Sequence, residues 1–312
     1  MSKSQRPLPA QLPLPPPPLA PRHWPVWLGI GLLTLAARLP WGLQRSLGRG
    51  LGHGLRLVAG KRRAVVHANL RACFPEQDER WRAALLRENF AAVGIGVFEF
   101  ARAWWGSIAP LRKRVRWAGL EHLRGALAGG RGAILISGHF MTLEICARLL
   151  CDEVPVAGLY RPHDTAAMEW AVKRGRLRYA YAMFGRDELR PALRHLKQGG
   201  VLWFAPDQDT LRGENVFVPF FDVPARSLTS THQLARMSGA AVLAFFHRRE
   251  PDGSYTLEIK PPFDDFPSSD ARTDTARVMA AIEAMVRAAP EQYLWLHKRF
   301  KRRPEGDASL YD

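Results

Sequence analysis

The chain has 312 residues, 47% of them hydrophobic, so it is long enough to bury a full core. It carries 45 Lys and Arg against 29 Asp and Glu, and this net charge of +16 favours anionic partners: nucleic acid, acidic proteins or lipid phosphates. Three cysteines, Cys73, Cys146 and Cys151, make no disulfide framework and lack metal-site spacing, so we expect buried, reduced thiols.

The first 60 residues divide into two segments of unlike composition. Residues 1–23 are rich in proline, so we expect a tail that cannot pack and is disordered or polyproline. Residues 24–60 begin with the apolar stretch 24–37, which is shorter than the ~20 residues of a bilayer span and lacks a signal-peptide cleavage site. Its tryptophans and the arginines that follow favour a membrane-associated helix at the interface; an ordinary core helix is the alternative.

The remainder, residues 61–312, is predicted to form one domain with a helical lead-in (61–115) and an α/β core (116–312). Apolar residues recur at helical spacing through 78–105, whereas strand-like and helical runs alternate in the core. That order is typical of a largely parallel sheet flanked by helices, with some mixed pairing near the C-terminus. The strand candidates are 133–137, 154–160, 201–205, 241–247 and 255–260, and the helix candidates are 142–150, 165–177, 188–197, 230–237 and 273–288.

His139 and Glu144 form an H-x4-E pair directly after the strand 133–137. Positions five apart on one helix are rotated by roughly 140°, so the two side chains can meet only if His139 lies in the turn before the helix. A histidine held by a carboxylate is what a general base needs. We therefore predict that His139 takes a proton from a substrate hydroxyl while Glu144 orients the imidazole. The alternative is a histidine that only caps or packs.

Two more predicted strands end in polar residues, and chemistry in open parallel sheets collects beyond the carboxyl ends of the strands. Arg161 follows the second strand, and Asp207 and Asp209 follow the third, so we expect them to converge with His139 on one rim. A surface ion pair for Arg161 and a turn or cap for the aspartates are the alternatives. The two aspartates lack a supporting His or Cys cluster, and no nucleotide-binding glycine motif or G-x-S-x-G run appears. We therefore expect neither a metal nor a cofactor.

Several runs in the chain together resemble the late lipid A acyltransferases, specifically the lauroyl type, over roughly residues 64–311. They are H-F-M-T-L-E, G-L-Y-R-P, A-P-D-Q-D, N-V-F-V-P-F-F and the closing P-E-Q-Y-L-W-L-H-K-R-F-K-R-R-P-E-G. The resemblance implies a glycerophosphate-acyltransferase-like fold at the cytoplasmic face of the inner membrane. It implies transfer of an acyl chain from acyl carrier protein to a hydroxyl of an acyl chain on the Kdo-bearing lipid A precursor, Kdo(2)-lipid IV(A).

The resemblance also assigns roles to residues. It makes His139 and Glu144 the catalytic pair, Arg161 a substrate-positioning arginine, and Asp207 and Asp209 a D-x-D block. Glutamate rather than aspartate at position 144 favours the lauroyl subtype.

We add Arg178 and Arg299 to the substrate-binding residues. Arg299 belongs to the basic C-terminal run, which could bind phosphates or the carrier, a solvated end being the alternative. Asp222 departs from the family pattern, which usually has glycine there. Three rival functions stay open: an acyltransferase acting on glycerophosphate or another polar alcohol, a nucleic-acid-binding protein, and a non-catalytic membrane scaffold. No nucleic-acid reading module appears, so we expect no nucleic-acid partner.

Overall fold

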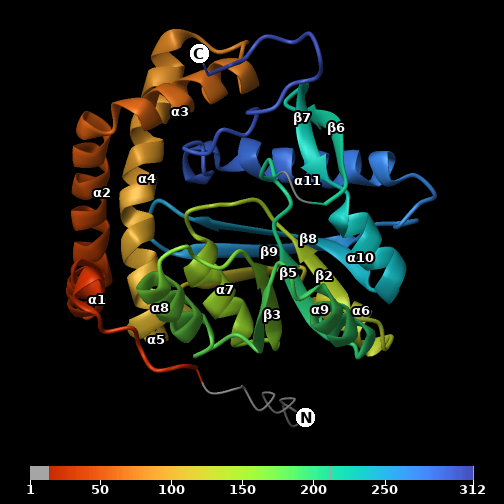
Figure 1. The fold of residues 1–312 in the computed structure, drawn as a ribbon, viewed down its shortest axis with the longest axis horizontal. Coiled ribbons are helices and arrows are strands. Elements are labelled where there is room, and N and C mark those ends of the chain that lie inside the picture. The colour runs from red at the N-terminus through yellow and green to blue at the C-terminus, as the bar shows by residue number, and fades with distance from the viewer. Residues whose placement is uncertain (1–13, 211–212, 312) are drawn as a thin grey trace.

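The computed structural model describes residues 14–210 and 213–311, and its N-terminal part is helical (Figure 1). This part comprises η1 (Pro21–His23), α1 (Trp24–Ala36), α2 (Trp41–Val58), α3 (Gly60–Cys73), α4 (Glu79–Trp105) and α5 (Ala109–Arg112). The helices predicted at 24–37 and 78–105 are confirmed as α1 and α4. Asp78 caps α4, because its side chain accepts a hydrogen bond from the backbone N–H of Trp81.

Within the described residues, seven strands form one sheet in the order β1-β9-β8-β2-β5-β3-β4. They are β1 (Val115–Ala118), β2 (Ala133–Ile136), β3 (Val156–Tyr160), β4 (Ala182–Gly185), β5 (Val201–Phe204), β8 (Ala241–Arg249) and β9 (Tyr255–Pro262). All neighbours pair in parallel except β8 and β9, which are antiparallel. The predicted class, an α/β domain with a mostly parallel, partly mixed sheet, is therefore confirmed. The short strands β1 and β4 were not predicted.

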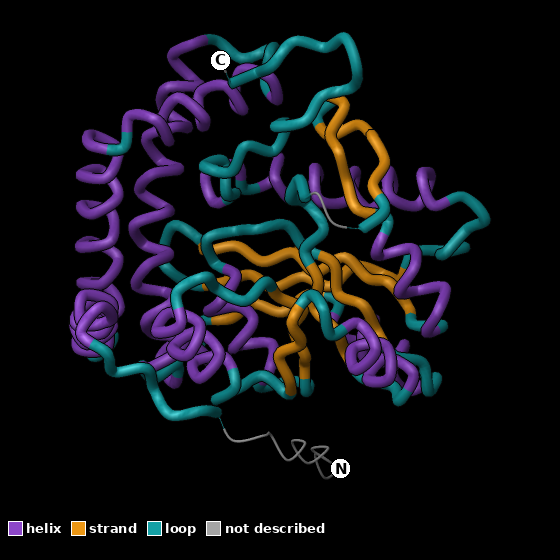
Figure 2. Tube along the Cα trace, viewed as in Figure 1, coloured by secondary structure: helices purple, strands orange, loops and turns teal. Residues whose placement is uncertain are grey.

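Helices cover both faces of this sheet, as Figure 2 shows with the strands gathered between them. They are α6 (Leu120–Ala128), α7 (Leu143–Cys151), α8 (Ala166–Arg176), α9 (Leu189–Lys197), α10 (Ser230–Ser238), α11 (Ala271–Ala288) and η2 (Pro290–Gln292). Side chains of β2 alternate between two cores: Ile134 and Ile136 belong to one, and Ala133 and Leu135 to the other. A separate antiparallel hairpin, β6 (Asn215–Phe220) and β7 (Val223–Leu228), packs beside α11.

Helix α2 lies very close to α4 because glycines meet at the crossing. A Cβ atom on Gly52 would lie 2.0 Å from the carbonyl oxygen of Phe90, and one on Gly94 would lie 2.0 Å from that of Gly48. No larger residue fits these positions without moving a backbone. One face of α2 is thereby fixed on α4, and beside that face the large apolar side chains of Leu43, Leu47 and Leu51 are exposed.

The structure corrects one expectation for the N-terminal tail and supports another for the thiols. Residues 1–13 lie outside the described residues, but in the part that follows, the carbonyls of Pro15 and Pro18 accept hydrogen bonds from Trp170 and Trp27. This stretch is therefore packed against α8 and α1 rather than free.

Among the described residues, none of the helices combines the length and apolar content that crossing a membrane requires. The three cysteines are free, and those in α3 and at the centre of α7 are buried as predicted.

Candidate active site

The turn after β2 places His139 at the carboxyl edge of the sheet, where Asp207 meets it from the end of the neighbouring strand β5. Asp207 Oδ1 lies 2.5 Å from the ring nitrogen Nδ1 of His139, and Oδ2 accepts the backbone N–H of His139 at 2.8 Å. The Asp207 side chain is 1% exposed, whereas the His139 side chain is 30% exposed. In the described part of the chain, Nε2 of His139 makes no hydrogen bond. The ring is thus held on one side and accessible on the other.

A second tie to Asp207 comes from the C-terminal segment. The hydroxyl of Tyr293 donates to Asp207 Oδ2 at 2.9 Å. The backbone of the same segment pairs with the histidine turn: Met141 N–H donates to Gln292 C=O at 2.8 Å, and Leu294 N–H donates to His139 C=O at 2.9 Å. The closing P-E-Q-Y-L-W run therefore clamps the turn that carries His139. The sequence singled out this run but gave Tyr293 no role.

The Asp207 carboxylate is kept ionised by its partners. Burial alone would raise the pKa of Asp207, but the charge of His139 and the hydrogen bonds from its ring, its backbone N–H and Tyr293 outweigh that effect. The pKa of Asp207 is lowered to about 2. An ionised carboxylate on Nδ1 leaves the Nε2 lone pair free to accept a proton and stabilises the imidazolium that results.

His247 lies on β8, the neighbour of β2, and contacts both ends of the turn that carries His139. Its Nδ1 lies 2.9 Å from Thr142 Oγ1, just before α7, and its Nε2 lies 3.3 Å from Ser137 Oγ, just after β2. Burial lowers the pKa of His247 to about 3, so this ring is neutral at physiological pH. The sequence placed His247 at a strand end without assigning it a function.

Glu144 does not orient His139, and this part of the prediction is wrong. In the first turn of α7 its buried carboxylate accepts hydrogen bonds from Trp104 Nε1 at 2.7 Å, Tyr179 Oη at 2.9 Å and Arg176 Nε at 2.9 Å. Burial alone would raise the pKa of Glu144, but the adjacent Arg176 and these hydrogen bonds lower it. Glu144 therefore links α7 to α4 and α8, and its hydrogen-bond partners within the described residues all lie on that side.

The other predicted site residues are divided between the rim and the interior. Arg161 is exposed and forms an ion pair of 2.8 Å with Asp164, the ordinary surface contact that was the alternative. The Asp209 side chain is 1% exposed and holds Arg302 through its guanidinium at 2.5 Å and its backbone N–H at 3.1 Å.

The two other predicted substrate-binding arginines contact the backbone. Arg178 donates to the carbonyl of Trp104. Arg299, 1% exposed, donates to Arg226 C=O and Ser227 Oγ, each at 2.6 Å, and holds β7 in place. Arg299 thus supports the fold from the interior.

The arrangement has the parts of a general base that activates a hydroxyl: an accessible imidazole nitrogen, an ionised carboxylate on the other nitrogen, and a rigid turn. In the described residues no cluster of three or more His, Cys, Asp or Glu side chains could hold a metal ion.

Comparison with known proteins defines the class. Residues 16–302 match the family described as bacterial lipid A biosynthesis acyltransferase. The chain belongs to this family and is an acyltransferase of lipid A biosynthesis, as the resemblance implied.

Individual relatives match over nearly the whole chain. It is 44% identical over 299 residues to the lipid A biosynthesis lauroyltransferase of Escherichia coli K12, covering 94% of this chain and 96% of that protein. It is 39% identical over 295 residues to the palmitoleoyltransferase of the same organism, with the same coverage. A solved 1-acyl-sn-glycerophosphate acyltransferase from Thermotoga maritima gives a TM-score of 0.37 at 17% identity, covering 80% of this chain and 97% of that one.

Proposed function

We propose that the protein transfers a lauroyl-type acyl chain from acyl carrier protein to a hydroxyl of an acyl chain on Kdo(2)-lipid IV(A). The observation that carries the proposal is the His139–Asp207 pair, with Nδ1 held at 2.5 Å and the ring 30% exposed at the carboxyl edge of the sheet. The lauroyl specificity is supported by the 44% identical relative. Because another relative, 39% identical, is a palmitoleoyltransferase, the test below measures chain length directly.

In the proposed mechanism His139 Nε2 takes the proton of the acceptor hydroxyl as its oxygen attacks the thioester carbonyl of the donor. The tetrahedral intermediate then collapses, the carbon–sulfur bond breaks, and the imidazolium returns the proton to the departing thiolate. Asp207 stabilises the imidazolium between these two steps, with Tyr293 and the backbone of His139 keeping the carboxylate in place. Such acid–base assistance is worth roughly 10²–10⁴-fold.

Glu144 acts in this scheme as a positioning residue. Its contacts to Trp104, Arg176 and Tyr179 fix the start of α7, and therefore the far end of the turn that carries His139. Arg161 and Asp209 follow β3 and β5, which end at the same edge of the sheet as the strand before the base. Arg161 therefore remains a proposed substrate-binding residue, and Asp209 one that acts through its partner Arg302. Of the basic residues proposed earlier, Arg178 is exposed and stays a candidate.

We place the protein at the cytoplasmic face of the inner membrane, with α1 and α2 at the bilayer interface. Large apolar side chains on these two helices are exposed, and basic residues flank them. A surface of this composition favours adsorption to an anionic bilayer.

The direct test uses purified protein, a labelled acyl carrier protein thioester and two acceptors, Kdo(2)-lipid IV(A) and glycerol 3-phosphate. Mass analysis of the products is expected to show one added acyl chain on the first acceptor. Acylation of glycerol 3-phosphate alone would establish the alternative acceptor class instead. Competing C12, C14 and C16:1 thioesters in one reaction would show the chain length, and fragmentation of the product would show the hydroxyl that is acylated.

A further inference from the structure

A large basic groove lies on the side of the molecule where α3 meets the C-terminal residues. Its volume is about 1280 Å³, and it is bounded by the end of α2, by α3, by α4 and by residues 298 and 309–311. Six cations line it, and no Asp or Glu does: Arg56, Lys61, Arg62, Arg63, Arg71 and Lys298. The small residues Ala64, Ala68 and Ala72 lie between these cations and keep the groove wide.

None of the six cations forms an ion pair with a carboxylate in residues 14–210 and 213–311. The lone histidine of the groove, His67, pairs with Glu79 at 2.7 Å, so the local acid is already used. The Nε atom of Arg56 is shielded from solvent and makes no hydrogen bond within the described residues. Six like charges around one cavity repel each other, and an anionic ligand removes that repulsion.

The groove is joined to the active site through the C-terminal segment. Asn69, on α3, donates to the carbonyls of Trp295 at 2.7 Å and His297 at 2.9 Å. Lys298 follows directly and lines the groove, whereas Tyr293, earlier in the same segment, holds Asp207. One short segment therefore forms a wall of the groove and supports the catalytic pair.

The surface next to the groove indicates what kind of anion it receives. Among the described residues, ten of the twelve exposed large hydrophobic side chains lie between Leu19 and Val58. The last two, Leu57 and Val58, are 69% and 81% exposed and adjoin Arg56 at the edge of the groove. An apolar surface that borders a basic groove suits a lipid whose phosphates lie at the bilayer surface better than a soluble acidic protein.

We infer that this groove binds the phosphorylated headgroup of the lipid acceptor, with the apolar face of α2 resting on the same bilayer. The inference rests on the proposed function, because it takes its ligand from the same reaction. An acceptor whose reacting hydroxyl is on an acyl chain carries its phosphates elsewhere on the molecule. It therefore needs a phosphate site apart from His139, and the groove supplies one.

The test compares two variants that lose the same charge. K61Q/R71Q removes two groove cations that make no other hydrogen bond or ion pair in the described residues. K113Q/R131Q removes one lysine and one arginine that are exposed and lie outside the groove. Initial rates are measured with acyl carrier protein thioester and Kdo(2)-lipid IV(A), and again with the acceptor after its phosphates have been removed. The melting temperature of each variant is recorded.

We expect K61Q/R71Q to raise the KM for the phosphorylated acceptor by about 25-fold, since each of the two cations facing an anionic lipid contributes a factor of roughly five. The KM for the donor, kcat and the melting temperature stay at wild-type values, and K113Q/R131Q behaves as wild type. With the dephosphorylated acceptor, wild type and K61Q/R71Q have the same KM.

Other outcomes overturn the inference. Equal effects of the two variants would mean that the total positive charge of the protein, and not this groove, sets the acceptor KM. A rise in the donor KM alone would make the groove a docking site for the carrier protein. An unchanged acceptor KM in an active K61Q/R71Q would leave the proposed function standing without this groove. Absence of transfer by the wild-type protein would instead refute the proposed function.

Discussion

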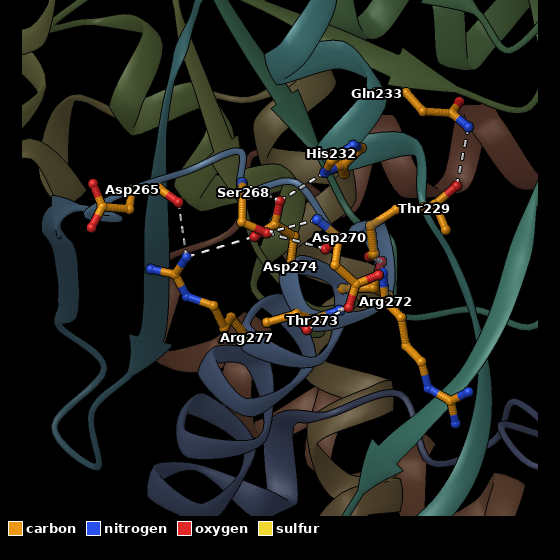
Figure 3. A network of polar contacts seen from close by, with 12 residues as sticks. Thr229, His232, Gln233, Asp265, Ser268, Asp270, Arg272, Thr273, Asp274 and Arg277 are labelled. Atoms are coloured by element: carbon orange, nitrogen blue, oxygen red, sulfur yellow. Dashed lines mark hydrogen bonds and ion pairs between the residues drawn. The ribbon is translucent and has the colours of Figure 1, made fainter.

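Two histidine–aspartate pairs in this protein have nearly the same contact and very different surroundings. His139 Nδ1 lies 2.5 Å from Asp207, and His232 Nδ1 lies 2.7 Å from Asp274, the pair shown in Figure 3. Each aspartate also accepts a backbone N–H, from His139 and from Ser268 respectively. The His139 side chain is 30% exposed, whereas the His232 side chain is 5% exposed.

The difference teaches that the pair itself does not make a catalytic site. His232 belongs to α10 and Asp274 to α11, so their contact joins two helices and the loop before α11 inside the molecule. His139 belongs to a turn at the carboxyl edge of the sheet, where a substrate can reach its second nitrogen. Access to that nitrogen is what distinguishes the proposed base, His139, from the structural contact of His232.

The largest effect is expected from His139→Ala. Without the base, kcat should fall by roughly 10⁴-fold, the upper end for acid–base assistance. The folded state should persist, because the removed ring is partly exposed and Asp207 keeps its bonds to the turn and to Tyr293. Steady-state rates and circular dichroism check this. A variant that is folded and turns over at the wild-type rate would refute the assignment.

Asp207→Asn and Glu144→Gln distinguish the two carboxylates of the site. Asn at 207 cannot stabilise the imidazolium, so kcat should fall roughly 10³-fold. Gln at 144 keeps an acceptor for Trp104 and Tyr179 and should reduce kcat much less. The kcat of both variants and of the wild type is measured across pH. Because the pKa of Asp207 is lowered to about 2, this carboxyl should contribute no step to the wild-type pH–rate profile above pH 4. A larger loss of kcat for Glu144→Gln than for Asp207→Asn would support the H-x4-E pair as the catalytic pair.

His232→Ala should act on stability rather than on rate. It removes the closest partner of the buried Asp274, which keeps the Ser268 N–H and Arg277 at 3.6 Å, so the loss in the free energy of unfolding should be about 1–3 kcal/mol. Urea denaturation gives this value, while kcat per folded molecule should be unchanged. The double variant H232A/D274A should be less destabilised than the sum of the two single variants, because both changes remove the same hydrogen bond. A fall in kcat without loss of stability would make this pair functional.

His247 should make the protein sensitive to acid. Burial holds its folded-state pKa at about 3, against an ordinary value of 6.5. Below pH 6.5 the unfolded chain therefore binds a proton that the folded protein does not, so stability present in full above pH 6.5 is lost as the pH falls toward 3. The slope is about 1.4 kcal/mol per pH unit. His247→Asn should show a flatter dependence between pH 6.5 and 4.5 in denaturant titrations, and an unchanged slope would contradict the assignment.

Much of the site could be predicted from local patterns. Parallel strands end at a common edge, so the strands before His139, Arg161 and Asp207 were expected to bring these residues to one rim, and β2, β5 and β3 are indeed neighbours. The turn that carries His139 follows from the buried strand before it and the amphipathic helix after it.

The partners of these residues could not be predicted, because distant helices determine them. Glu144 is five residues from His139, yet Trp104 of α4 and Arg176 of α8 take its carboxylate. Arg299 stands in a basic run and looks like a surface cation, but the β6–β7 hairpin buries it. The sequence near Glu144 and near Arg299 contains no pattern that indicates these distant partners.

Asp222→Gly should give the smallest effect, and unlike the variants above it should stabilise the folded protein. Asp222 and Phe221 form the two-residue connection between β6 and β7, with φ of +59° and +53°. Left-handed backbone is costly for residues with a Cβ atom, less so for aspartate, and free for glycine. Glycine also loses more entropy on folding, so the net gain in the free energy of unfolding should be about 0.5 kcal/mol.

Urea denaturation of Asp222→Gly should show a higher midpoint with an unchanged m-value. Asp222→Ala is the control. Alanine has a Cβ atom and lacks the local hydrogen bonds that help aspartate tolerate this conformation, so Asp222→Ala should lower the midpoint. Turnover should be the same in both variants, since a turn residue without a part in either histidine–aspartate pair changes the folding equilibrium alone. A lower midpoint for Asp222→Gly would mean that the aspartate side chain, rather than the backbone angle, stabilises the hairpin.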